Sequence, residues 1–175
     1  KRQGQGGMAA ILGLEDADVV AACAEAAQGE VVSAVNYNSP GQVVIAGAKA
    51  AVDRAIEGCK ARGAKRAMPL PVSVPSHCEL MRPAAERFAE SIAAINWQAP
   101  QIPLVQNVSA AVAADLDTLK RDLLEQLYKP VRWVESVQTL AANGATELVE
   151  CGPGKVLAGL NKRCAEGVSL SLIHI

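Results

Sequence analysis

Aromatic side chains and net charge are both scarce in this sequence. Aromatic residues make up 3% of the 175 residues, and the formal net charge at pH 7 is −1. Few aromatic rings means few platforms on which single-stranded nucleic acids could stack. A nearly neutral chain also lacks the positive potential that attracts nucleic acids or anionic membranes. We therefore expect small molecules or proteins as partners, with no nucleic acid and no membrane among them.

Long apolar runs and paired metal-binding residues are missing too. No stretch of about 18 apolar residues predicts a membrane span, and the first ten residues, KRQGQGGMAA, lack the apolar segment of a signal peptide. The five cysteines are scattered without a C-x-x-C pair. These features predict a reduced cytoplasmic protein without a metal site or a bound cofactor. Because the first methionine is Met8, we expect the chain to be a piece of a longer protein.

Hydrophobic periodicity and turn residues predict a β-α-β-β-α-β order in the first part of the chain. Val31–Val35 and Gln42–Ala46 are expected to pair as a hairpin across a turn at Asn38–Gly41. The other elements expected here are strands over 8–14 and 67–74 and helices over 16–27 and 49–61. This order is the ferredoxin-like split arrangement. Residues 7–72 are therefore predicted to form a ferredoxin-like small subdomain.

The following residues alternate between helices and strands in the manner of a layered α/β region. Helices are expected over 78–95, 116–127, 131–142 and 155–163, and strands over 102–105 and 147–150. The first helix is expected to turn five apolar side chains inward: Leu80, Ala84, Phe88, Ile92 and Ile95. Two strands are too few for a stable sheet. We therefore expect further strands of this sheet upstream of the sequence. An incomplete sheet exposes strand edges and apolar faces, which predicts that the chain alone aggregates or folds only in its small subdomain.

The last residues, 166–175, look atypical. They end in the apolar stretch SLSLIHI, which is interpreted either as a short strand or as a remnant of cloning or of a shifted reading frame. We assign no function to His174, one of the two histidines. A second short feature, Gly152-Pro153-Gly154-Lys155, lacks the spacing of a phosphate-binding loop and is interpreted as a structural turn.

The stretch VSVPSHCELM contains the other histidine, His77, at a predicted helix start. Ser76 and Glu79 match the S-x-x-E capping box, so a structural role is the simpler interpretation. With Ser76 as N-cap, His77 would lie in the first helical turn, where the helix dipole disfavours the imidazolium and leaves a usable base. A base needs a nucleophile, yet G-x-S-x-G is absent. Cys78 is interpreted as a packing residue.

Six blocks occur in order along the chain: MAAILGL, VNYNSPGQVVIAG, LPVSVPSHCELM, IPLVQNV, QLYKPVRW and ECGPGKVLAGL. With these blocks the sequence resembles the malonyl-CoA:acyl-carrier-protein transacylases of bacterial type II fatty-acid synthesis, from about Gly6 to Cys164. The resemblance implies an α/β-hydrolase-like large subdomain with an inserted ferredoxin-like small one. Residues 73–165 would then be the C-terminal part of the large subdomain. It also implies malonyl-CoA and acyl carrier protein as partners in a ping-pong transfer through a serine.

The resemblance assigns roles to individual residues. His77 falls on the family's general base, and Gln126 on the residue whose main-chain carbonyl orients that ring. Asn36 and Asn38 fall where the small subdomain faces the cleft, although a turn is the preferred interpretation of VNYNSPGQ. The family's G-H-S-x-G serine, its malonyl-binding arginine and its oxyanion-hole glutamine loop are absent. The isolated chain is therefore expected to be an inactive, N-terminally truncated fragment.

Two other functions remain open at this point. The acyltransferase domain of a modular polyketide synthase shares the fold and could match the same blocks. A non-catalytic ferredoxin-like binding module could account for residues 7–72 alone. The motifs after Val72 favour an acyltransferase, because a binding module has no need of VPSH, QLYKPV and GPGK in that order.

Overall fold

The first part of the chain forms a four-stranded antiparallel sheet. The structure, a computed structural model, describes residues 6–72 and 74–173. The sheet has the strand order β2-β3-β1-β4, and all neighbouring strands run antiparallel. The elements of this part are β1 (Gly6–Leu12), α1 (Asp16–Ala27), β2 (Val32–Ser39), β3 (Gln42–Ala48), α2 (Lys49–Ala61) and β4 (Arg66–Pro69). The predicted β-α-β-β-α-β order is present.

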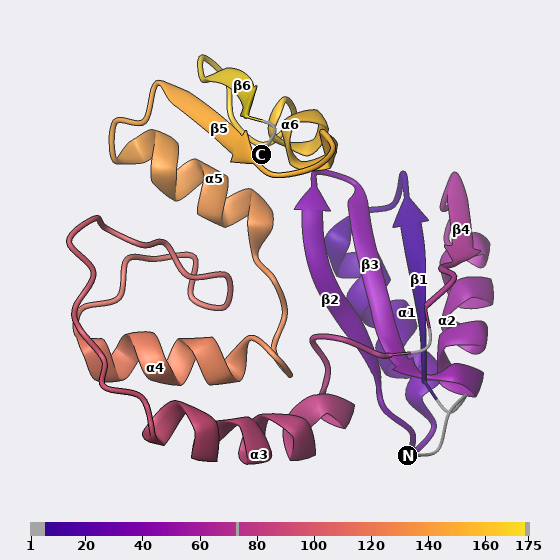
Figure 1. Cartoon of the computed structure of the whole chain (residues 1–175). Coiled ribbons are helices and arrows are strands. Elements are labelled where there is room, and N and C mark those ends of the chain that lie inside the picture. The colour runs from indigo at the N-terminus through magenta and orange to yellow at the C-terminus, as the bar shows by residue number, and fades with distance from the viewer. Residues whose placement is uncertain (1–5, 73, 174–175) are drawn as a thin grey trace.

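Helices α1 and α2 cover one face of this sheet (Figure 1). Alternate side chains of the strands point to opposite faces, so Ala9 and Ile11 of β1 enter the core beneath the helices. Met8 belongs to a smaller cluster that also contains Val44 and Cys78. The main core is filled by aliphatic side chains such as Ile45, which has no exposed surface. The scarcity of aromatic residues is thus compatible with a sealed core.

The boundaries of two strands differ from the predicted ones. β2 continues to Ser39, so Asn38 lies in a strand, and the turn to β3 consists of Pro40 and Gly41. Gly41 has a φ of 70°, a left-handed conformation that a glycine adopts without strain. β4 ends at Pro69, well before the predicted end at Val74. Pro71 and Pro75 lack backbone N–H groups, and such residues do not sustain a ladder.

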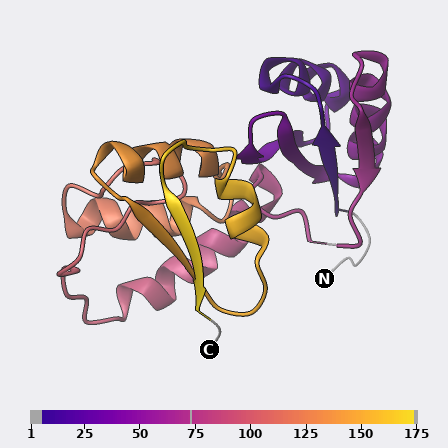
Figure 2. The ribbon, with the colours of Figure 1, turned by 90° about the horizontal axis from the view of Figure 1, so that it is seen from above.

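The second part contains a parallel pair of strands and most of the remaining helices. The two strands, β5 and β6, lie beside α5 and α6 in both views (Figures 1 and 2). The elements are η1 (a 3₁₀ turn, Glu79–Met81), α3 (Arg82–Ala93), α4 (Leu116–Glu125), α5 (Trp133–Ala142), β5 (Glu147–Cys151), α6 (Val156–Asn161) and β6 (Ser169–Ile173). The end of the chain therefore contributes a short strand, the first of the two interpretations considered. His174 lies outside the described residues.

Two predictions in this part differ from the structure. The helix expected over 78–95 is present as α3, but it begins only at Arg82, with Pro83 in its first turn, where a missing N–H costs nothing. The expected strand 102–105 is absent: Val105 forms one isolated bridge with Val112, and Ile102 is 79% exposed. Prolines 100 and 103 flank and interrupt this stretch, which disfavours strand pairing.

Helix α3 leaves several large apolar side chains in contact with solvent. It packs against α4 and buries Ala85 and Ile92. The expected burial of Ile92 is confirmed. Phe88 is 38% exposed, and Leu80 and Ile95 are 42% and 51% exposed, so the expectation that these three face inward is wrong. Contacts with α4 bury only a narrow face of α3, whereas the sequence pattern predicted a wider buried face. Among the described residues no helix is long and apolar enough to cross a bilayer.

Candidate active site

His77 is held at two points by the chain that follows α4. Its ring Nδ1 lies 2.5 Å from the main-chain oxygen of Gln126, and its backbone N–H donates to the oxygen of Leu127 at 3.0 Å. A carbonyl oxygen can only accept a hydrogen bond, so Nδ1 must carry the proton. In the neutral ring, the other nitrogen, Nε2, then has a free lone pair that can accept a proton.

The backbone of His77 is in an uncommon conformation. Its φ of 63° lies in the left-handed region, where histidine occurs more often than most non-glycine residues. This conformation costs on the order of 1–2 kcal/mol per residue. The two hydrogen bonds to Gln126 and Leu127 offset that cost. Both the ring and the backbone of His77 therefore depend on one short segment, 126–127.

The predicted capping box is wrong. The residue before η1 is Cys78, and its side chain does not cap that turn. Glu79 instead pairs with Arg82 through contacts of 2.7 and 2.8 Å. His77 precedes the helical residues, so it does not lie in the first turn of a helix. The carbonyl of Gln126 fixes the tautomer of its ring.

Cys78, next to His77, is a packing residue, as predicted. It is 1% exposed, and its Sγ donates to the oxygen of Pro75 at 3.2 Å. Burial raises the pKa of its thiol above the ordinary value, which disfavours the thiolate that a nucleophile would need. Among the described residues, no group of three or more His, Cys, Asp or Glu side chains could hold a metal ion.

A small hollow of about 200 Å³ adjoins His77. It is lined by Ser76, His77, Met81, Gln126 and Leu127. Ligand sites commonly measure about 300–1,000 Å³, so this hollow amounts to part of a site. Two larger hollows lie elsewhere, one of about 290 Å³ beside α4 and one of about 590 Å³ between α1 and α2. We favour the smaller one because it contains the oriented histidine.

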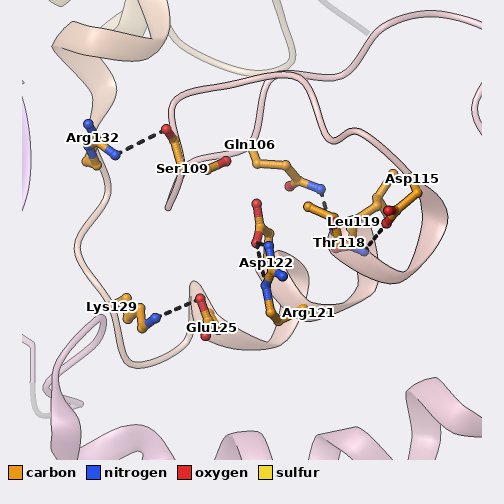
Figure 3. Close-up of polar contacts among 10 residues, drawn as sticks. All are labelled: Gln106, Ser109, Asp115, Thr118, Leu119, Arg121, Asp122, Glu125, Lys129 and Arg132. Atoms are coloured by element: carbon orange, nitrogen blue, oxygen red, sulfur yellow. Dashed lines mark hydrogen bonds and ion pairs between the residues drawn. The ribbon is translucent and has the colours of Figure 1, made fainter.

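The carbonyls that hold His77 come from the C-terminal end of α4. The last carbonyls of a helix have no partner within it and are free to accept other donors. The N-cap of α4 is Asp115, whose carboxylate accepts from the N–H of Thr118 at 2.7 Å, and an ion pair of 2.8 Å joins Glu125 and Lys129 across its other end (Figure 3). Each end of α4 thus has a side-chain contact of its own.

Asn107 contacts the same segment from another loop. Its Nδ2 donates to the side-chain Oε1 of Gln126 at 3.1 Å, and its main-chain oxygen accepts from the N–H of Arg132 at 2.9 Å. The Arg132 guanidinium also donates to the oxygen of Ser109 at 3.1 Å (Figure 3). Sequence reasoning identified His77 and Gln126 but missed Asn107 and Leu127. Asn107 stands in the block IPLVQNV, which was its only signal.

A buried polar cluster lies behind this loop (Figure 3). Asp122 of α4 is 2% exposed, and its Oδ1 accepts from Arg121 at 3.1 Å. Its Oδ2 and the Oγ of Ser109 are buried without a hydrogen-bond partner among the described residues. The nearby Gln106 side chain donates to the oxygen of Leu119 at 3.4 Å.

The edge strand β2 supports the segment that follows Leu127. The N–H of Val131 donates to the oxygen of Val35 at 2.8 Å, and the N–H of Tyr37 donates to the oxygen of Val131 at 3.0 Å. Asn36 lies between them and forms a parallel bridge with Val131. Asn38 accepts a hydrogen bond at its main-chain oxygen from Cys164 at 3.5 Å. Neither asparagine lines the hollow beside His77.

Comparison with known protein families identifies similarity over nearly the whole sequence. A model described as the acyl transferase domain matches residues 1–168. The chain is 55% identical over 172 residues to the malonyl CoA-acyl carrier protein transacylase of Escherichia coli (strain K12). The match covers 98% of this chain and 56% of that protein, so the chain spans about half the length of the curated relatives it matches.

Solved structures also match this chain over nearly its whole length. An acyl carrier protein S-malonyltransferase from Vibrio cholerae is 54% identical, with a TM-score of 0.96 over 99% of this chain and 56% of that one. A malonyl-transacylase in complex with a type II PKS acyl-carrier protein is 48% identical, with a TM-score of 0.94 over 100% of this chain and 56% of that one. The α/β architecture is therefore that of these acyltransferase structures.

Proposed function

Since this chain belongs to the acyl transferase domain family, we propose that it supplies the general base for malonyl transfer from malonyl-CoA to acyl carrier protein. The observation that carries this proposal is the 2.5 Å contact between His77 Nδ1 and the Gln126 oxygen, which leaves Nε2 as the free acceptor. In this role His77 is the catalytic base, and Gln126 orients it through its main chain.

The proposed reaction has two halves with one proton acceptor. In the first, Nε2 takes the proton of a serine hydroxyl as its oxygen attacks the malonyl thioester, and the proton passes to the departing sulfur of coenzyme A. In the second, Nε2 takes the proton of the phosphopantetheine thiol, whose sulfur attacks the malonyl ester, and returns it to the serine oxygen. The Gln126 carbonyl acts where a carboxylate acts in a Ser-His-Asp triad. Transfer between two thiols in this way needs no metal or redox cofactor.

The serine is not part of this chain, because no G-x-S-x-G occurs in its sequence. We therefore propose that residues outside this chain complete the site and that the isolated chain has no turnover. This division accords with the 56% of the Escherichia coli relative that the chain covers. We propose that the chain is divided into three regions. These are a ferredoxin-like small subdomain over 7–72, the C-terminal part of an α/β-hydrolase-like large subdomain over 73–165, and a tail over 166–175. We also propose that this transfer takes place in the cytoplasm.

Asn36 and Asn38 are proposed to shape the substrate cleft from the edge of β2. Support comes from the bridge between Asn36 and Val131, which lies four residues beyond Leu127. Because neither side chain lines the hollow beside His77, their contribution is expected at substrate binding rather than at proton transfer. Asn38→Ala is expected to raise KM with kcat unchanged, and an unchanged KM would count against this role.

A hybrid enzyme tests the proposed function. This chain would replace the matching 172 residues of the Escherichia coli malonyl CoA-acyl carrier protein transacylase, and transfer of labelled malonyl to acyl carrier protein would be measured. We expect the hybrid to be active and His77→Ala to lower kcat by about 10²–10⁴-fold, the usual contribution of a general base. A His77→Ala hybrid as active as its parent would refute the assignment of the base.

The identity of the carrier protein is a further question. The similarity to a malonyl-transacylase bound to a type II PKS acyl-carrier protein favours a polyketide carrier as the second candidate acceptor. The hybrid should therefore be assayed with a fatty-acid carrier and a polyketide carrier side by side. We expect a higher kcat/KM with the fatty-acid carrier. A non-catalytic binding module predicts no transfer to either one.

A further inference from the structure

We propose that Asn107 is a positioning residue for His77. Its side chain holds Gln126, the residue whose main-chain oxygen accepts the hydrogen bond from the His77 ring. The geometric part of this inference concerns the chain by itself. Only its catalytic consequence rests on the proposed function.

Asn107 contacts the segment 126–132, which follows α4, both before and after the turn that this segment makes. Before the turn, its Nδ2 donates to Gln126 Oε1 at 3.1 Å. After the turn, its main-chain oxygen accepts from the N–H of Arg132 at 2.9 Å. Between these two contacts lie Leu127, which binds the backbone of His77, and Val131, which bridges to β2. One residue thus joins the beginning and the end of the segment that carries both acceptors of His77.

The loop that carries Asn107 is held in place by hydrogen bonds of its own. Its neighbour Gln106 is buried and closes a tight turn with Ala110 and Ala111 through backbone hydrogen bonds of 2.9 and 3.0 Å. The hydroxyl of Thr139 in α5 donates to the Ala110 oxygen at 2.7 Å, which attaches this turn to a second helix. A positioning residue must be fixed by its own surroundings, and the loop of Asn107 meets that condition.

The contact matters because Gln126 lies at the C-terminal end of a helix. Terminal residues of helices fray, and their carbonyls change direction as they do so. An anchored Gln126 side chain restricts this motion and keeps the carbonyl directed at Nδ1. If the carbonyl turned away, the proton could reside on either ring nitrogen, and Nε2 would be protonated in part of the molecules. Such molecules lack a base.

Two substitutions at one position separate hydrogen bonding from packing. Asn107→Leu keeps a similar shape but cannot bond to Gln126. Asn107→Asp can still accept a hydrogen bond from the Gln126 amide after that amide rotates by half a turn, since the amide carries an NH₂ donor beside its acceptor oxygen. Asn96→Leu is the matched control, because Asn96 is exposed. The proposal predicts that Asp resembles the native residue and that Leu does not.

The readout is the nitrogen NMR spectrum of the His77 ring in the hybrid enzyme, where residues outside this chain complete the fold around it. The spectrum of the His77→Gln hybrid assigns its signals against those of the other histidines. We expect one tautomer, with the proton on Nδ1, in the native hybrid, in Asn107→Asp and in Asn96→Leu. Asn107→Leu should show both tautomers, and exchange of the His77 backbone N–H should become roughly five- to tenfold faster, the effect of losing about one net hydrogen bond.

Gln126→Ala provides a second variant if Asn107→Leu does not fold. It removes the partner of Asn107 but keeps the main-chain carbonyl, so it should show the same mixture of tautomers. A single tautomer in Asn107→Leu and in Gln126→Ala would overturn the proposal, as would mixed tautomers in Asn107→Asp.

Malonyl transfer by the hybrid enzyme measures the catalytic consequence of losing the Asn107 contact. There Asn107→Leu should lower kcat about tenfold at unchanged KM, while Asn107→Asp restores most of it. An unchanged kcat in Asn107→Leu would overturn the catalytic part. If the native hybrid shows no transfer while the spectra behave as expected, the proposed function fails and the positioning role of Asn107 stands.

Discussion

Residues 6–69 hide their large apolar side chains, whereas residues 74–173 leave many of theirs exposed. Among the described residues, Val20 and Met68 are the exposed large apolar side chains of the first region. The second region exposes Val74, Leu80, Phe88, Ile95, Ile102, Leu104, Val112, Val149, Val156, Leu157, Leu172 and Ile173. The first region therefore closes its main core with its own residues. The second presents surfaces that another segment can cover, and it also carries the proposed catalytic base.

The difference follows from how the two regions pair their strands. In the first region each strand has a neighbour, and two helices cover one face. In the second, β5 and β6 pair only with each other among the described strands, and one parallel pair of strands is too small a sheet to bury both faces. Contacts along β2 and the turn after it connect the regions. Val131 bridges to Asn36, and Arg163 donates to the Pro40 oxygen at 3.0 Å.

The largest expected effect comes from creating a cavity in the closed region. Ile45 is fully buried, so Ile45→Ala should lower the free energy of unfolding by about 2–5 kcal/mol. Ile102 is 79% exposed, so the matched Ile102→Ala should change it by less than about 0.5 kcal/mol. Urea unfolding followed by circular dichroism measures both. Equal losses would contradict the contrast between the regions.

Cysteine labelling should sharpen the comparison without any substitution. Cys151 is exposed and should react first with a thiol reagent. Cys164 should follow. Cys23, on the buried face of α1, should react last, because burial raises the pKa of its thiol to about 12 and the reagent reaches it only through opening of the closed core. Mass spectrometry of timed samples gives the order. Labelling of Cys23 before Cys164 would show that the first region opens more easily.

The smallest effect is expected for an exposed ion pair near the site. The hydrogen bond from Arg132 lowers the pKa of Glu135 below its ordinary value of 4.5. A lowered pKa in the folded state stabilises the fold above that ordinary value, and the contribution is lost as the pH falls through the folded-state pKa. Glu135→Gln should therefore cost less than about 1 kcal/mol at pH 7, and the difference should vanish in acid. A cost that grew in acid would contradict this sign.

The sequence was informative where local patterns decide the structure. The order of elements in 6–69 could be predicted because alternation and helical periodicity depend on neighbouring residues. The helix expected over 78–95 is present, but its start was placed too early because Pro83 belongs in a first turn. The strand 102–105 was wrong, since Val105 forms an isolated bridge instead of a strand. The capping box was also wrong, since Glu79 pairs with Arg82 instead.

The contact between His77 and Gln126 spans 49 residues. No local pattern of residues predicts such a pair, and its expectation came from resemblance to a known family. Asn107 escaped prediction for the same reason, because its partner lies 19 residues away across a loop and a helix. Side-chain partners of this kind are set by tertiary packing. The structure was needed to find them.

The central claim is that this chain supplies the base-bearing side of a cleft that other residues complete. Amide hydrogen exchange, compared between the isolated chain and the hybrid enzyme, tests it most directly. We expect equal protection of β1, β2 and β3 in both proteins, and protection of α3 that is at least about a hundredfold greater in the hybrid. Equal protection of α3 in the two proteins would contradict the claim.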